Sequence, residues 1–140
     1  MEAKEIWSLF QKHMGYTDEE METFRSDPEK VKMVTQTPEF VKYRAIAEVV
    51  ESHGCHAGHR VGDRFVMTAG GQLIAGESPK RMCMFAIGPV SHTLPAIYER
   101  LVTKSDPNLE RSQIVQFIDV GLDKGGWGKI LMKVYLEKTG

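Results

Sequence analysis

The residues best suited to chemistry lie together in one short segment, HGCHAGHRVGD at positions 53–63. It contains His53, Cys55, His56 and His59, which are three of the five histidines and one of the two cysteines of the chain. Imidazole and thiolate are ligands that suit Zn(II) and other borderline-soft transition metals. The glycines of the segment allow a loop to fold tightly around an ion. The segment therefore makes a metal site a fair hypothesis.

The spacing within the segment limits how many of these side chains can share one ion. They stand too close together along the chain for all of them to converge easily, and the sequence contains no CxxC pair. A tetrahedral site would need a donor from elsewhere, and the candidates are Cys83 and a carboxylate, either Asp119 or Asp63. A polar surface loop with solvated histidines, and catalysis without a metal, are the alternatives that the segment leaves open.

Cys83 is the second thiol to be weighed. It follows the Ser-Pro pair at 78–79, which is typical of a helix start, and two cations lie just before it in the sequence. A helix N-terminus and nearby cations both favour thiolate over thiol, which would prepare Cys83 as a nucleophile or a metal ligand. The alternative is a buried core residue, because apolar side chains flank it on both sides.

Two residues near the C-terminal end of the chain are also candidates for a site. Asp119 ends the apolar stretch VQFID, where an acid is either a turn residue or a group aimed into a site at the strand end. Trp127 stands among three glycines, so it either covers a pocket or pins a loop onto the core.

The first 42 residues carry the signals of short helices. Apolar side chains fall on one helical face before Gly15, and Thr17 and Glu20 have the spacing of a capping box. The pairs Asp-Pro at 27–28 and Thr-Pro at 37–38 are typical of an N-cap followed by a proline in the first turn. We expect three short helices or helical turns, forming a helical N-terminal appendage.

The remaining residues, 43–140, alternate between strand and helix patterns. The patterns predict strands near 43–50, 64–68, 113–120 and 129–136, with two helical pieces between 78 and 101. For the first strand, a helix continuing from Pro38 is the rival. The order predicts an α+β fold, an antiparallel sheet of two hairpins around a central helix (ββαββ), in a single domain over 1–140.

Composition narrows the classes of function. The 140 residues are 41% hydrophobic and 26% charged, as in one globular domain, and the net charge of −1 attracts neither nucleic acid nor membrane. The chain contains no long apolar run and no signal-peptide pattern, and its two cysteines fit a reducing compartment, so we expect a cytoplasmic protein. No strand is followed by a glycine-rich phosphate turn, so no nucleotide cofactor is expected.

The charge is unevenly divided along the chain. Residues 1–40 carry nine acids and five bases, whereas residues 41–140 carry ten acids and thirteen bases. This asymmetry suggests an acidic appendage on a mildly basic core, and the acidic helices are a candidate docking element for a larger enzyme.

The segments GCHAGHRVGDRFV, PKRMC and FIDVG resemble a family of small uncharacterised bacterial proteins with a Cys-x-x-Gly-His-x-x-Gly-Asp-x-Phe motif. The resemblance covers about residues 43–137. The positions that match the family pattern are Cys55, Gly58, His59, Gly62, Asp63, Phe65, Cys83 and Asp119. The chain departs from the family at Ile118, where a third cysteine is frequent, and in its helical N-terminus. The resemblance implies no activity. It supports the fold and this choice of residues, and the missing thiol argues against a thiolate-rich zinc site.

Three hypotheses of function follow. The first is a small metal-dependent enzyme for a small-molecule substrate, in which Cys55, His59 and Cys83 hold Zn or another divalent transition metal. Asp119 is then a ligand or general base, and His56 either hydrogen-bonds to a metal ligand from behind it or is an acid/base group. The second is a non-catalytic accessory subunit or interaction module, bound to a larger enzyme or to a second copy of the chain. The third is a metal-free enzyme with Cys83 as nucleophile and His56 or His59 as base.

Overall fold

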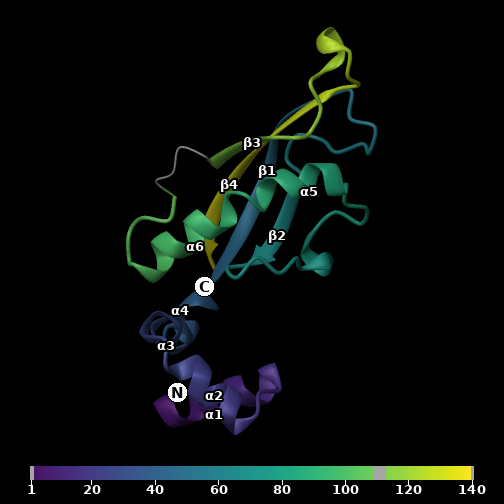
Figure 1. Ribbon diagram of the computed structural model, residues 1–140. Coiled ribbons are helices and arrows are strands. Elements are labelled where there is room, and N and C mark those ends of the chain that lie inside the picture. The colour runs from purple at the N-terminus through teal and green to yellow at the C-terminus, as the bar shows by residue number, and fades with distance from the viewer. Residues whose placement is uncertain (1, 109–112, 140) are drawn as a thin grey trace. The chain divides into compact units, whose positions relative to one another are not determined.

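The computed structural model describes residues 2–108 and 113–139, and the chain divides into two compact units (Figure 1). The first unit is Met1–Val41 and the second is Lys42–Gly140. The division lies one residue from the boundary predicted between the helical appendage and the α+β core. Each unit has a buried apolar cluster of its own, and the two clusters share no residue.

The first unit consists of helices whose ends match the sequence signals. They are α1 (Ala3–Met14), α2 (Asp18–Arg25), α3 (Pro28–Thr35) and α4 (Thr37–Phe40). Gly15 ends α1 with φ of 72°. At the start of α2 the capping box is complete, because the Thr17 hydroxyl accepts the N–H of Glu20 and the Glu20 carboxylate accepts the N–H of Thr17. The Asp27 carboxylate caps α3 by accepting the N–H of Glu29.

The sequence predicted three helical pieces in this unit, and the structure has a fourth, because α4 is a separate single turn. The Thr-Pro pair lies inside α4, and the residue before it, Gln36, takes the N-cap position. The core of the unit is aromatic: Trp7 is buried, and the rings of Phe10 and Phe24 lie 6.0 and 6.4 Å from it. Arg25 stacks over the Trp7 ring at 4.5 Å.

The second unit is built on an antiparallel sheet of four strands. The strands are β1 (Tyr43–His53), β2 (Arg64–Thr68), β3 (Ile114–Gln116) and β4 (Lys129–Lys138). Their order across the sheet is β2-β1-β4-β3. Both expected hairpins are therefore present, and β1 and β4 pair along nearly their whole length, with a register shift between Val49 and Glu51.

One face of this sheet is the apolar core. Alternate residues of β1, β2 and β4 pack there against α5 (Met84–Val90) and α6 (Leu94–Val102), the two helices visible along that face in Figure 1. Within the cluster, Ala47 pairs with Phe65 on one side and with Val134 on the other. The strand prediction for residues 43–50 was correct because this alternation outweighed the helix-forming residues in the same segment.

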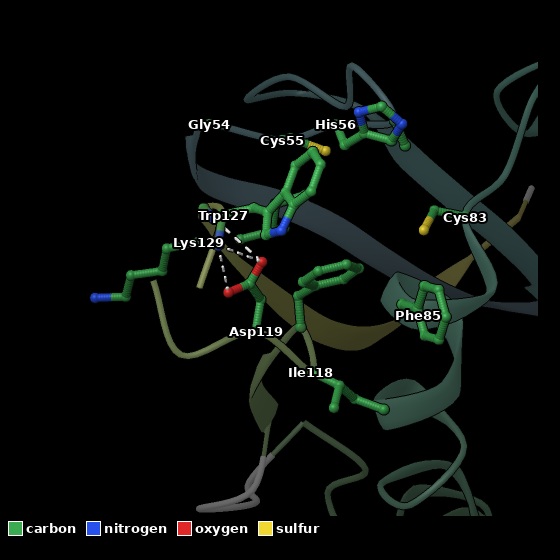
Figure 2. Close-up of a pocket in the computed structure, with 13 residues that line it drawn as sticks. Gly54, Cys55, His56, Cys83, Phe85, Ile118, Asp119, Trp127 and Lys129 are labelled. Carbon is green, nitrogen blue, oxygen red and sulfur yellow. Dashed lines mark hydrogen bonds between the residues drawn. The ribbon is translucent and has the colours of Figure 1, made fainter. Parts of the chain in front are cut away.

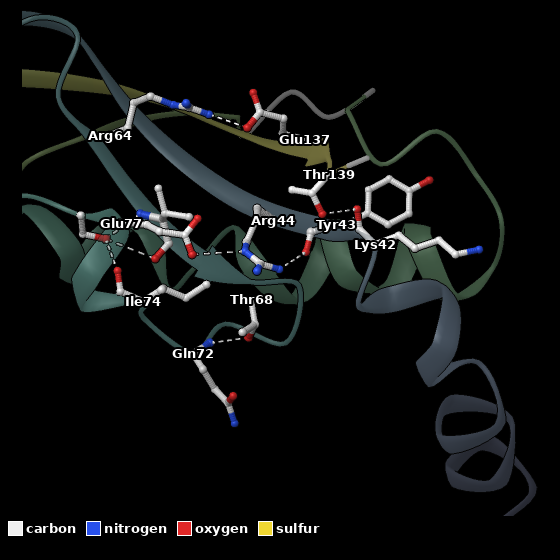
Figure 3. Close-up of polar contacts among 12 residues, drawn as sticks. Lys42, Tyr43, Arg44, Arg64, Thr68, Gln72, Ile74, Glu77, Glu137 and Thr139 are labelled. Carbon is white, nitrogen blue, oxygen red and sulfur yellow. Dashed lines mark hydrogen bonds and ion pairs between the residues drawn. The ribbon is translucent and has the colours of Figure 1, made fainter. Parts of the chain in front are cut away.

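The opposite face of the sheet carries polar side chains that link strands. Arg64 on β2 reaches over β1 to Glu137 on β4, with 2.7 Å between the guanidinium and the carboxylate (Figure 3). The Tyr135 hydroxyl donates to Glu48 at 3.0 Å. Ile46 and Val66 are buried on this same face, while the larger apolar cluster lies on the other face.

Two sequence predictions in this unit were wrong in their boundaries. The Ser-Pro pair at 78–79 does not open a helix, because the Ser78 hydroxyl accepts the N–H of Val66 and donates to the carbonyl of Ile74, which ties this segment to the edge of the sheet. Helix α5 begins only at Met84. The strand expected over 113–120 is confined to β3, and the chain leaves the sheet before Asp119.

Candidate functional site

The segment 54–63 is the long connection between β1 and β2, and its base is closed by backbone hydrogen bonds. Val49 donates its N–H to the carbonyl of Asp63, and Gly62 donates to the carbonyl of Val49. Within the loop, Gly58 donates to the carbonyl of Cys55. This framework orients neighbouring histidines differently, and His56 is exposed while His59 is buried.

His59 points into the protein and holds the backbone before α5. Its side chain is 3% exposed, its Nε2 accepts the N–H of Cys83 at 3.1 Å, and its Nδ1 lies 3.6 Å from a carboxylate oxygen of Asp63. The Phe65 ring packs edge-on against the imidazole at 4.9 Å. Because Nε2 accepts a hydrogen bond, the neutral ring carries its proton on Nδ1, on the side of Asp63. His59 therefore links the loop to the backbone of Cys83.

A cavity of about 400 Å³ lies between this loop, the start of α5 and the loop that joins β3 to β4 (Figure 2). Cys55, His56, Cys83 and Asp119 line it, so four of the five predicted site residues come together there. Both cysteines are free thiols, and both are partly buried. The rest of the lining is mostly apolar and includes Phe85 and Trp127.

Asp119 also lines the cavity, but its oxygens serve the backbone around it. One oxygen accepts the N–H of Gly121 at 3.0 Å, the other accepts that of Gly128 at 3.1 Å, and the N–H of Trp127 lies within 3.2 Å of both. These backbone hydrogen bonds, that from Gly121 having the largest effect, hold the pKa of Asp119 below its usual value. A carboxylate with a lowered pKa is a weak proton acceptor, so this arrangement favours a role in shaping the loop over a role as general base.

The two loops on either side of the cavity meet through glycine backbones. A Cβ added to Gly128 would lie 2.2 Å from the carbonyl oxygen of Gly54 and 2.3 Å from that of His53. A Cβ on Gly54, whose φ is 66°, would lie 2.7 Å from the carbonyl oxygen of Trp127. Only glycine fits at these positions, and the close approach places Trp127 beside His56, with 5.4 Å between the ring centroids.

Sequence reasoning missed the aromatic side of the cavity. Phe85 and Phe117 line it, and their rings meet edge-on with 6.3 Å between centroids. Nothing in their positions separates them from ordinary core residues of a helix and a strand. Trp127 was singled out by its glycine neighbours, and of its two alternative roles the structure gives it a place in the cavity lining.

The predicted set of metal ligands converges only in part. Cys55, Cys83 and Asp119 face one cavity, whereas His59 does not line it and both its ring nitrogens lie beside other groups. Over residues 2–108 and 113–139, no three histidine, cysteine, aspartate or glutamate side chains are grouped so that they could hold a metal ion. The metal hypothesis stays a prediction.

Comparison of the chain with protein-family models, with curated proteins and with solved structures found no match. Within the part of the chain that the structure describes, no helix combines the length and the apolar character needed to cross a membrane. The function of the cavity must therefore be argued from its own residues.

Proposed function

We propose that the second unit is a small enzyme that binds a small molecule in the cavity and acts on it with a cysteine thiol. The observation that carries this proposal is that Cys55, His56 and Cys83 line one mostly apolar cavity of about 400 Å³. Cavities of about 300–1,000 Å³ with a few polar groups among apolar walls are typical of small-molecule sites. In this proposal, the two hairpins around the central helical segment (ββαββ) are the frame that holds the cavity.

Cys83 is the proposed nucleophile and His56 the proposed base. Of the two histidines weighed as bases, His59 already accepts the N–H of Cys83 through Nε2, whereas His56 lies at the cavity. In the proposed step, the Cys83 thiol gives its proton to the imidazole of His56. The sulfur then forms a bond to an electrophilic carbon of the substrate, and the displaced electron pair moves to a heteroatom of the substrate.

The contact between His59 and Cys83 supports this choice of nucleophile. It fixes the backbone of Cys83 immediately before α5, and the carbonyl of Cys83 accepts the N–H groups of Ala86 and Ile87. A reactive group on a fixed backbone needs less reorganisation to meet a substrate. The expected cytoplasmic location fits as well, because reducing conditions keep both thiols free.

The experiment measures the alkylation rate of each cysteine in the full chain with iodoacetamide at neutral pH, by mass spectrometry. We expect His56→Gln to slow native-state alkylation of Cys83 about tenfold or more, since a positioned base contributes at least this much. The matched control is His53→Gln, at the last residue of β1 just before this loop and outside the cavity lining. In urea, the wild type and both variants should show the same alkylation rate of Cys83.

Two results of the alkylation experiment would overturn the proposal. The first is Cys83 that reacts only on unfolding, and the second is a native rate that His56→Gln leaves unchanged. Metal content per chain is measured in the same samples, with Cys55→Ser and Cys83→Ser as variants. One equivalent of metal in the wild type, lost in both variants, would replace thiol catalysis by the metal-dependent alternative, with the two thiolates as ligands.

The accessory-module alternative has one observation in its favour. The first unit carries an apolar cavity of about 400 Å³, lined by residues that include Leu9 and Val41, which are 50% and 63% exposed. An apolar patch on the acidic helices, without a cavity near Cys55, would favour such a module. The first condition is met and the second is not, because Cys55 lines the site described above.

A further inference from the structure

The aromatic rings around the cavity come in two pairs from different parts of the chain. His56 and Trp127 meet at 5.4 Å with an angle of 73° between their planes, and Phe85 and Phe117 meet at 6.3 Å and 89°. All four line the cavity. Figure 2 shows Trp127 beside Cys55 and His56. Phe85 lies on the other side of the view, near Cys83.

Two of these rings have large areas without a protein partner. Trp127 is 71% exposed and Phe85 is 65% exposed, although both border a cavity. The backbone of Trp127 is nevertheless held in place, because the Asp119 carboxylate accepts its backbone N–H and glycine backbones pack beside it. Aromatic rings prefer edge-to-face or offset contact with other rings at about 4.5–7 Å. A ring in the cavity would supply this contact to both residues.

The charges at the cavity disfavour a charged ligand. Asp119 and Lys129 are the charged residues of the described lining. The Asp119 carboxylate is enclosed by backbone N–H groups, and its negative charge would repel an anion. Lys129 pairs with Glu51 at 3.8 Å, and Figure 2 shows its side chain extending away from the cavity, so it does not offset that repulsion. Apolar walls add a desolvation cost for an ion of either sign.

We propose that the ligand of this cavity is an uncharged aromatic molecule of one or two rings, an inference that rests on the proposed function of the cavity as a substrate site. The volume is consistent with this size. A cavity of about 150 Å³ holds benzene, so about 400 Å³ accommodates a bicyclic ring with a small substituent. The ring packs between Trp127 and Phe85, within the lining that also contains the two thiols.

In the experiment, four probes of similar size are titrated with the full chain, and binding is followed by ligand-observed NMR. The probes are 2-naphthylmethanol, its saturated decahydro analogue, 2-naphthoate and 2-naphthylmethylamine. We expect 2-naphthylmethanol to bind about tenfold more tightly than each of the other three. Trp127→Ala should weaken its binding about tenfold. Leu122→Ala is the control, because Leu122 is 69% exposed in the same loop but does not line the cavity.

Each contrary result has a defined meaning. Equal binding of the saturated analogue overturns the aromatic class, and tighter binding of the acid or the amine overturns the uncharged class. Failure of all four probes to bind overturns the inference as a whole. The alkylation rate of Cys83 is measured in the same samples. A His56-dependent rate without probe binding removes only this ligand class, whereas probe binding with an inert Cys83 removes the thiol chemistry and leaves an aromatic-binding site.

Discussion

His59 and Asp119 show how a polar residue near a site can act through the backbone. His59 accepts the N–H of Cys83 and stands beside Asp63, while Asp119 accepts N–H groups across the loop that carries Trp127. Each is therefore a positioning residue in our proposal, acting through Cys83 or Trp127. A positioning role can be distinguished from a purely structural role, because the alkylation rate of Cys83 reports on His59 and the emission of Trp127 reports on Asp119.

The first prediction concerns His59. In His59→Leu the N–H of Cys83 loses its acceptor, and a buried unpaired donor costs about 1–3 kcal/mol. We expect the free energy of unfolding in urea to fall by about this amount and the native alkylation rate of Cys83 to change, with Cys55 unaffected. His59→Gln, whose amide oxygen can accept the same N–H, should restore the rate. The control is His92→Leu at an exposed position.

A loss of stability without any change in the alkylation rate of Cys83 would mean that His59 is structural only. The same conclusion would follow if His59→Gln restored the stability but left the rate as in His59→Leu. The pH profile of Cys83 alkylation is a second readout. If His59 has a positioning role, His59→Gln should have the same pH profile as the wild type, and the profile of His59→Leu should be shifted.

The second prediction concerns the pH dependence of the loop around Asp119. Backbone hydrogen bonds lower the pKa of its carboxyl below the ordinary 3.8, so the ionised form favours the folded loop. The stabilisation is present in full above the ordinary value and is lost as pH falls through the lower, folded value. The emission of Trp127, taken as the difference between the wild type and Trp127→Phe, should stay constant down to pH 3.8 and shift below it.

Asp119→Asn should give the shifted emission already at neutral pH, because its amide group cannot accept all of these N–H bonds. Asp123→Asn, an exposed acid in the same loop, is the matched control and should behave as the wild type. An emission change near the ordinary pKa in the wild type, or an unchanged signal in Asp119→Asn, would contradict this role for Asp119.

At the scale of elements, sequence signals predicted the helix ends and strands that depend on interactions between residues close together in the chain. The helix caps at Thr17 and Asp27 act within three residues, and alternate residues of β1 face the apolar core. The start of α5 could not be predicted in this way. Ser78 bonds to Val66, twelve residues away, so the Ser-Pro signal was overridden by the sheet.

The site was predictable in its residue types but not in its orientations. Clustering of thiols and imidazoles was enough to select Cys55 and His56, and the cations and expected helix start before Cys83 selected that residue; all three line one cavity. The direction of His59 depends on Cys83, twenty-four residues further along the chain. Likewise, the close approach of Gly54 and Gly128 depends on the pairing of β1 with β4, which no local pattern specifies.

At the scale of the whole molecule, the two units differ in the size of their cores. Among the residues that the structure describes, the cluster of the first unit has three buried residues, including Trp7 and Met21, whereas that of the second has twelve. Stability grows with the share of surface that a unit buries, and about 40 residues is near the lower limit for independent folding. The first unit is therefore expected to unfold at lower denaturant concentration than the second.

The third prediction is that urea unfolding of the full chain shows two transitions. Emission of Trp7, isolated in Trp127→Phe, should report the first, and protection of β1 and β4 peptides in hydrogen exchange should report the second. Met21→Ala should lower the free energy of unfolding of the first transition only, by about 2–5 kcal/mol, as expected for a buried methionine. Val134→Ala, fully buried in the sheet core, should lower only the second. Coincident transitions, or a shift of both by either variant, would show that the two cores unfold as one cooperative unit.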